Sequence, residues 1–200
     1  VDNSGAIQSE AKGDSGNGGT VNIAANNVSL DTGSQINTSS KNIGNGGSIT
    51  VSANTQAEVD GKLVSKGGKT SGDGGIIEVD ANSATISDTA KLNTNARNQG
   101  QGGRVSINTS ADAQVNGKIQ SQGGKQSGQG GTIQIAANSA SLGASSALDS
   151  SAGAAGNGGA VNVSTATQLS DSATLSANGG NAQGNGGTVS LQSQSVSLTS

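Results

Sequence analysis

A four-residue glycine motif recurs along the chain and limits what the chain can fold into. The motif is a glycine, then Asn, Asp or Gln, then two glycines, and it occurs seven times at one constant interval. The first glycines of the motifs are Gly16, Gly44, Gly72, Gly100, Gly128, Gly156 and Gly184. A fixed period of about 28 residues is typical of solenoids, in which each unit buries its apolar face only against its neighbours. The sequence therefore predicts a repeat protein.

The segment after each glycine motif has the pattern of a β-strand with one buried face. Its second and fourth residues are aliphatic in all seven units, and all of them except Leu191 are β-branched. The second residues are Val21, Ile49, Ile77, Val105, Ile133, Val161 and Val189, and the fourth are Ile23, Val51, Val79, Ile107, Ile135, Val163 and Leu191. Mostly polar residues stand between them, and this alternation predicts a half-buried strand.

The amino-acid composition indicates which side chains fill the interior of the fold. The 200 residues include 34 glycines and no Pro, Cys, Met, His, Phe, Tyr or Trp. Such a composition usually indicates disorder, but a disordered linker has no reason to keep aliphatic residues in phase. The lack of aromatic residues favours a narrow interior filled by Val, Ile, Leu and Ala. No apolar run approaches membrane-spanning length, so membrane insertion is not expected.

The charged residues are spread along the sequence. Ten Lys and Arg and 13 Asp and Glu give a net charge of −3. No stretch of the sequence reads as a basic patch, and no aromatic side chain is present to stack on bases. Nucleic acid is therefore not an expected partner. The absence of cysteine excludes disulfides and thiolate metal sites.

Units of two kinds alternate. The unit at residues 20–47 has a turn at 31–34 between its second and third apolar segments, whereas the unit at 48–75 has a shorter turn at 60–62. The alternation continues, so the true repeat is a doublet of two units, about 56 residues in all. In the sixth unit Asp171 stands where the other units of its kind have Val, which predicts a shortened or bulged second strand. We call the two classes first-kind units (20–47, 76–103, 132–159) and second-kind units (48–75, 104–131, 160–187).

Each unit reads as three short strands separated by turns. If each unit is one coil, equivalent strands stack in parallel and the aliphatic columns line the inside. The predicted fold is all-β, a right-handed parallel β-helix (β-solenoid) with about 28 residues and three short strands per coil, alternating in the doublet. Coils are expected to stack about 4.8 Å apart. Four asparagines at the first corner are expected to form a hydrogen-bonded ladder between coils: Asn26, Asn54, Asn82 and Asn138.

The repeats extend over the chain as one solenoid segment. Residues 20–187 form six full coils, residues 188–200 a partial coil, and residues 1–19 a partial coil with Val1 and Ile7 facing inward. Solenoids normally protect their ends with atypical capping units, and neither end shows one. We therefore expect the 200 residues to be a segment cut from a longer array.

Five lysines form the candidate ligand site. Lys62 and Lys118 occupy one slot of the second-kind units, two coils apart. Lys69 and Lys125 share another slot, and Lys66 lies beside them. Together they predict a basic edge on the second-kind coils that contacts an acidic polysaccharide. The alternative interpretation is that these lysines only solubilise the rod or protect strand edges.

No cofactor, metal or catalytic site is expected. Asp73 gives the third glycine motif a likeness to calcium-binding repeats, but the other six motifs have Asn or Gln there, which favours a structural turn. Polysaccharide-cleaving β-helices need convergent carboxylates, usually with a basic residue nearby. No such cluster breaks the repeat, so the sequence predicts a protein that is not an enzyme.

The coil sequence GNGGTVNIAANNVSLDTGSQINTSS and the coils after it resemble a known repeat type. They are similar to the GNGG-x-I-x-I-x-A repeats of filamentous haemagglutinin-type adhesins, large bacterial exoproteins exported by two-partner secretion that include high-molecular-weight and biofilm-matrix adhesins. The resemblance implies an extracellular β-helical shaft at the bacterial cell surface. It also implies export through an outer-membrane two-partner-secretion transporter.

Three functions follow as expectations. The first is a structural stalk that projects a binding region toward a receptor on a host or neighbouring cell, for attachment, aggregation or biofilm formation. The second is a shaft that itself binds an extracellular polysaccharide. The third is the delivery stick of a contact-dependent toxin, which uses similar repeats.

Overall fold

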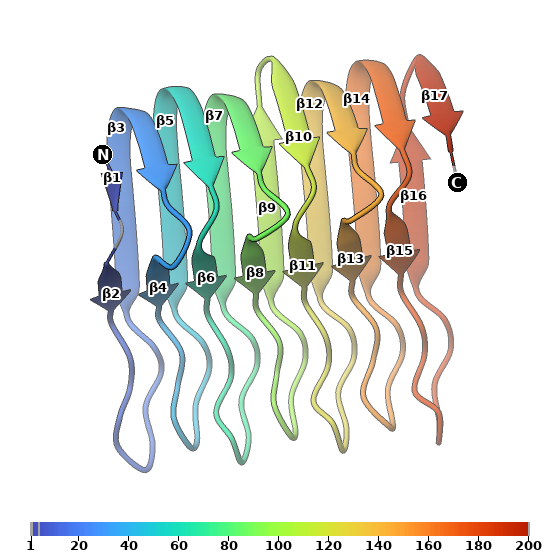
Figure 1. The fold of residues 1–200 in the computed structure, drawn as a ribbon. Helices are drawn as coiled ribbons and strands as arrows, with labels where there is room; N and C mark the ends of the chain where they lie inside the picture. Colours follow the sequence, from blue (N-terminus) through green and yellow to red (C-terminus); the bar gives the residue numbers. More distant parts are fainter. Residues whose placement is uncertain (1, 4, 200) are drawn as a thin grey trace.

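The computed structural model shows a rod of stacked β-coils (Figure 1). It describes residues 2–3 and 5–199, so Val1, expected at an inward position, lies outside the described residues. Within the described ranges no helix is long and apolar enough to cross a membrane. The strands form a ten-stranded and a seven-stranded sheet, and neighbouring strands in both sheets run parallel.

The long strands carry most of each coil. In five coils this strand is continuous: β3 (Thr20–Leu30), β5 (Ser48–Val59), β7 (Ile76–Ile86), β12 (Thr132–Leu142) and β14 (Ala160–Asp171). Elsewhere the same stretch is divided, as β9 (Arg104–Thr109) with β10 (Asp112–Val115) and β16 (Thr188–Gln192) with β17 (Ser195–Leu198), or only its end is present, as in β1 (Asp2–Asn3). The short strands are β2 (Ala6–Gln8), β4 (Gln35–Asn37), β6 (Lys62–Val64), β8 (Lys91–Asn93), β11 (Lys118–Gln120), β13 (Ala147–Asp149) and β15 (Thr174–Ser176).

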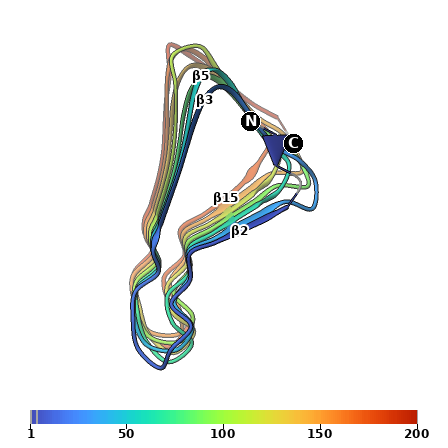
Figure 2. The same cartoon turned by 90° about the vertical axis from the view of Figure 1, so that its left-hand side faces the viewer.

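The path of the chain is a right-handed coil. In Figure 1 the chain climbs on the far side of the rod, crosses over the top toward the viewer and descends on the near side while it advances toward the C-terminus. Seen along the rod (Figure 2), each coil is three-sided, with a narrow extension below that we call the tail. The tail joins the short strand to the next long strand. Its residues are 38–47, 65–75, 94–103, 121–131, 150–159 and 177–187, with 9–19 in the first partial coil.

The predicted architecture is confirmed, with one difference in the strands. Equivalent residues pair one coil apart, as Val21 does with Ile49 and Ile49 with Ile77. The first and second predicted strands are, however, one continuous strand in most coils, bent at the top of Figure 2. Small residues such as Ala25 and Ala53 lie at this bend and let the strand turn without ending.

The core consists of the predicted aliphatic columns. Ile49, Val51, Ile77, Val79 and Ile107 are all fully buried. The second half of the long strand and the short strand contribute further columns of buried aliphatic residues. Burial of each such side chain contributes about 1.5–3 kcal/mol, so the columns hold adjacent coils together. The members of these further columns include Leu30, Val59, Ile86, Val115, Leu142, Ile36, Leu63, Leu92, Ile119 and Leu148.

The two kinds of coil differ by compensating length changes. The long strand has 11 residues in β3 but 12 in β5, and the ladder shifts register at the bend, between Ala25 and Asn27. The second-kind coil also has one more residue in its tail and two fewer in the turn before its short strand. The period is therefore the same for both kinds of coil although their segments differ.

Two local predictions have different outcomes. The prediction that the second strand is shortened or bulged at Asp171 is wrong: β14 runs to Asp171, which pairs in register with Leu142 and is buried. Its carboxylate Oδ1 accepts a 2.9 Å hydrogen bond from the N–H of Ala173, which satisfies one of its acceptors within the turn. The expected asparagine ladder forms at one rung, where Asn54 Nδ2 donates to Asn26 Oδ1 at 2.9 Å.

The glycine motif builds the narrow neck between each coil and its tail. The N–H of the glycine at the fourth motif position donates across the neck to a carbonyl at the start of the tail, as Gly103 does to Thr94 at 2.8 Å. A Cβ on the glycine at the third motif position, Gly102, would overlap with the Ser121 carbonyl of the next coil. The first glycine has a left-handed backbone, with φ 130° at Gly100, which glycine adopts at little cost. These three requirements explain why the motif repeats.

Candidate polyanion-binding surface

The structure gathers the cations that are spread along the sequence. Nine of the ten Lys and Arg lie on the short strands or in the tails, and the exception is Arg104 at the start of β9. Nine of the 13 Asp and Glu lie instead on the strands of the ten-stranded sheet or in the turns that follow them. The rod therefore has a cationic side, of which the sequence analysis predicted only a basic edge of five lysines.

The first column of cations runs along the seven-stranded sheet. Lys62 of β6 pairs in register with Lys91 of β8, and Lys91 pairs with Lys118 of β11. The three side chains therefore occupy one outward column on adjacent coils. The sequence analysis paired Lys62 with Lys118 but missed Lys91, because the alternating turn lengths place it one residue later than the fixed period predicts.

The second column runs along the tails. Lys41, Lys69, Arg97 and Lys125 follow one another at the period of the repeat, each three residues before the first glycine of a motif. Backbone hydrogen bonds join neighbours in this column, from the N–H of Lys69 to the carbonyl of Lys41 at 3.0 Å and from Lys125 to Arg97 at 3.2 Å. Lys41 and Arg97 lie in first-kind units and were missed, although the fixed period alone would have identified them.

Lys66 couples the two columns electrostatically. It is half-buried at the start of a tail. Burial lowers the pKa of Lys66 below its ordinary value, and the positive charges of Lys91 and Arg97 lower it further. Lys66 follows β6, the strand that carries Lys62, and it lines one groove with Arg97 of the second column, so it lies between the two columns. We call the two columns and Lys66 together the cationic flank: Lys41, Lys62, Lys66, Lys69, Lys91, Arg97, Lys118 and Lys125.

A groove of about 440 Å³ crosses the tail part of the cationic flank. Lys66, Lys69 and Lys125, three of the five predicted site residues, line it together with Arg97. Lys62 and Lys118 lie outside this groove, on the strand face. Neutral amide side chains complete the lining: Asn95, Asn98 and Gln122.

The positive charges of the cationic flank have no bonded partner among the residues that the structure describes. In the part of the chain that the structure describes, none of the eight side chains forms an ion pair or a hydrogen bond. A second cavity of about 270 Å³ adjoins the groove through Arg97 and includes Glu10, Lys12 and Lys41. Like charges thus stand on successive coils with no counter-charge bonded to them, and an anion from solution can relieve their repulsion.

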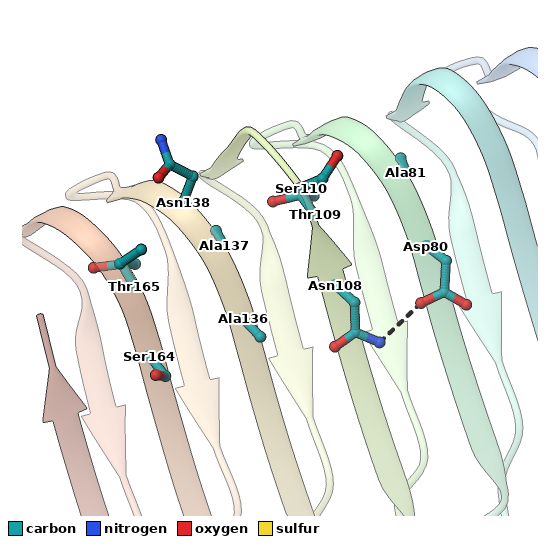
Figure 3. A pocket seen from close by; sticks show the side chains of 11 residues that line it. Asp80, Ala81, Asn108, Thr109, Ser110, Ala136, Ala137, Asn138, Ser164 and Thr165 are labelled. Atoms are coloured by element: carbon teal, nitrogen blue, oxygen red, sulfur yellow. Dashed lines mark hydrogen bonds between the residues drawn. The ribbon is translucent and has the colours of Figure 1, made fainter.

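A larger depression lies elsewhere, at the bend of the long strands (Figure 3). It has a volume of about 650 Å³ and is wide open to solvent. Asp80 is the one charged residue in its lining, and it accepts a 2.8 Å hydrogen bond from Asn108 Nδ2. The remaining side chains are small, as Ala136 and Ser164 illustrate. This depression offers no second ionisable group for acid–base chemistry.

The acidic residues do not converge on a metal site. Among the described residues no group of three or more His, Cys, Asp or Glu is placed to hold a metal ion. Asp73 of the third glycine motif has a structural role in the stack: its Oδ1 accepts a 2.7 Å hydrogen bond from the N–H of Gln101 in the next coil. Asn45 Oδ1 accepts in the same way from the N–H of Asp73 at 2.9 Å.

The fold defines the class of protein, a parallel β-solenoid built from coils of about 28 residues. Comparison of the chain with protein-family models, with curated proteins and with solved structures gave no match.

Proposed function

We propose that the chain is a rigid shaft in a secreted or surface-anchored bacterial adhesin and holds a binding region away from the cell. The observation that carries this proposal is the unbroken stacking of coils in register along the whole rod. Each coil lengthens the rod by about 4.8 Å and makes the same contacts with its neighbours. A rod of this kind therefore fixes the distance between the structures attached to its two ends.

The division of sequence variation between the two faces supports the proposal. The inward columns hold aliphatic side chains with almost no exception, Asp171 being the clearest one. The outward column of the same strands changes from Asn22 to Thr50 to Glu78 on successive coils. A spacer needs a constant core and tolerates any polar outer surface.

The resemblance of the coils to filamentous haemagglutinin-type repeats supports the adhesin context. On this proposal the shaft is extracellular, leaves the cell through an outer-membrane two-partner-secretion transporter, and presents a region that contacts a receptor on another cell. On the same proposal the shaft itself performs no catalysis, and its wide depression at the bend is lined by a single ionisable residue, Asp80.

A change in coil number tests the shaft function. One doublet, residues 76–131, can be deleted in frame or duplicated in the bacterium that makes the protein, because residues 76 and 132 begin equivalent coils. We expect both variants to be exported and folded, with the reach of the rod in electron micrographs changed by about 10 Å per doublet and attachment changed only in degree. A control variant replaces the outward Asn22 and Gln134 by Ser. Attachment abolished by this control, with an intact rod, would contradict a spacer.

A further inference from the structure

We propose that the cationic flank binds a linear acidic polysaccharide that lies along the rod axis, with one anionic group for each coil. This inference goes beyond the shaft function, because it makes the side of the rod a ligand-binding surface. It rests on three observations: the two columns of cations, the lack of an ion-pair or hydrogen-bond partner for their side chains among the described residues, and the groove along the tail column, which Lys66 also lines.

The spacing of the cations fits an extended polyanion. Residues paired on adjacent parallel strands stand about 4.8 Å apart along the rod, and Lys62, Lys91 and Lys118 are paired in this way. The tail column, from Lys41 to Lys125, supplies four successive cations at the same interval. In an extended glycan with a carboxylate or sulfate on each sugar, the charges recur at about the length of one sugar ring. This spacing is close to the coil rise, so the glycan meets a cation on each coil.

The groove lining favours a glycan over a nucleic acid. Asn95 Nδ2 donates to Gln122 Oε1 at 2.9 Å, the N–H of Gln122 donates to Asn95 Oδ1 at 2.8 Å, and Gln122 Nε2 donates to Asp149 Oδ2 at 2.5 Å. These amides are therefore held in place between the cations as a neutral polar part of the groove lining. Single-stranded nucleic acids are bound largely by stacking on aromatic side chains, and the chain contains none. The phosphates of a DNA strand recur about every 3.4 Å, a shorter repeat than the coil rise.

The test measures binding of the chain to alginate, a linear polyuronate, with dextran as neutral glycan and duplex DNA as the other polyanion. A quadruple variant removes the tail column: Lys41→Gln, Lys69→Gln, Arg97→Gln and Lys125→Gln. A matched control makes the same change in net charge on the ten-stranded sheet: Asn22→Asp, Gln114→Glu, Gln134→Glu and Gln168→Glu. Calorimetric titrations over a series of salt concentrations give the affinities, and thermal unfolding verifies that both variants fold.

We expect alginate to bind and dextran not to bind. The glutamine variant is expected to lose about tenfold or more in affinity, and its slope of log affinity against log salt to fall by about 3, since each ionic contact with a polyanion contributes roughly 0.7–0.9 to the slope. The control is expected to lose less than about threefold, because its added charges lie on another face and are screened within about 8 Å at physiological salt.

Other outcomes overturn the inference. Equal losses of alginate affinity in both variants would mean that binding depends only on the net charge of the protein. Absence of alginate binding would mean that the flank is a solubilising surface. Tighter binding of DNA than of alginate, with the same sensitivity to the glutamine changes, would assign the flank to nucleic acid. None of these results bears on the shaft function, which depends on the inward columns and on coil number.

Discussion

The hydroxyl of Ser150 is buried in the neck without a hydrogen-bond partner, and the residue beside it in the next coil is Ala177. In the two preceding doublets this pair is a Thr and a Ser. Thr94 Oγ1 donates to Ser121 Oγ at 3.0 Å, and Ser121 Oγ donates onward to the carbonyl of Gly103 at 2.6 Å. The third doublet has lost this relay because Ala177 has no hydroxyl.

Ala177→Ser is therefore expected to stabilise the rod. The new hydroxyl accepts from Ser150 and donates to the carbonyl of Gly159, the equivalent of Gly103, which adds about 0.5–1.5 kcal/mol per hydrogen bond. The free energy of unfolding from urea titrations measures the gain. In a Ser150→Ala background the gain is expected to shrink, since one of the two bonds is missing. A destabilised Ala177→Ser protein would show that the neck has no room for the relay.

The converse change is expected to weaken an intact relay. Ser121→Ala leaves the Thr94 hydroxyl buried and unpaired, which costs about 1–3 kcal/mol. Ser145→Ala is a suitable control, since that exposed side chain makes its one hydrogen bond at the surface, to the carbonyl of Asn116. If the two variants unfold at the same urea concentration, the neck hydroxyls have no stabilising role.

The sequence was sufficient to predict the coil period, the parallel stacking and the inward columns, because each is a consequence of spacing alone. It did not predict the continuous long strand. Each unit was interpreted as three short strands separated by turns, whereas in the stack small residues such as Ala25 allow a bend without a break. The prediction for Asp171 was wrong because it considered only the low strand propensity of this one residue. In the stack Asp171 pairs with Leu142 on one side and with Leu198 on the other, and this pairing keeps it in the ladder.

The candidate site was predicted only in part. Lys62, Lys66, Lys69, Lys118 and Lys125 were identified from second-kind units, and all five belong to the cationic flank. Their partners in the intervening first-kind units, such as Lys91, depend on which residues share a column. Compensating changes in turn and tail length shift Lys91 by one residue, so a fixed period does not reveal it. Lys41 and Arg97 keep the fixed period and were overlooked.

The glycine at the third position of the motif is expected to tolerate no side chain within the stack. A Cβ at Gly130 would overlap with the carbonyl of Ser150 in the next coil, and such overpacking costs about 1–3 kcal/mol or more. Gly186 occupies the same slot of the motif but has open space around its Cβ direction. We therefore expect Gly130→Ala to lower the thermal midpoint strongly and Gly186→Ala to leave it nearly unchanged. Equal midpoints would contradict the neck geometry.

Ile107→Ala is expected to cost about 2–5 kcal/mol, through lost burial and the cavity left behind. Ile107 is fully buried with coils on both sides. Gln114→Ala, at an exposed position of the same coil, should change stability by less than about 0.5 kcal/mol. Ser106, although outward, is an unsuitable control, since it is only 1% exposed between the strands that carry Glu78 and Gln134. Similar urea midpoints for the Ile107 and Gln114 variants would show that the faces are assigned wrongly.

Lys66→Gln is expected to stabilise the protein at neutral pH. Burial, and then Lys91 and Arg97, lower the pKa of Lys66 in the folded state below its ordinary value of 10.5. Between the folded-state and the unfolded-state pKa of Lys66, the unfolded chain therefore binds more protons than the folded protein. The charged Lys66 thus destabilises the folded state at low pH, and this destabilisation is lost as the pH rises toward the unfolded-state pKa. The gain over the wild type should be largest near pH 7 and should shrink toward pH 10.5.

Lys69→Gln is the matched control for that experiment, because it removes the same charge from an exposed position of the same tail. Its effect on the thermal midpoint is expected to be smaller than that of Lys66→Gln at pH 7. A gain for Lys66→Gln that is constant across this pH range, or equal to that of Lys69→Gln, would contradict the coupling of the two columns.

Distances between spin labels test the central claim, that each coil adds one rise to a continuous stack. The chain has no cysteine, so labels can be placed at Ala24 with Ala136 and at Ala24 with Ser164, positions of one outward column four and five coils apart. Pulsed electron–electron double resonance is predicted to give narrow distributions near about 19 Å and about 24 Å between backbone positions, which differ by one coil rise. Broad distributions, or two distances that do not differ by one rise, would contradict the stack.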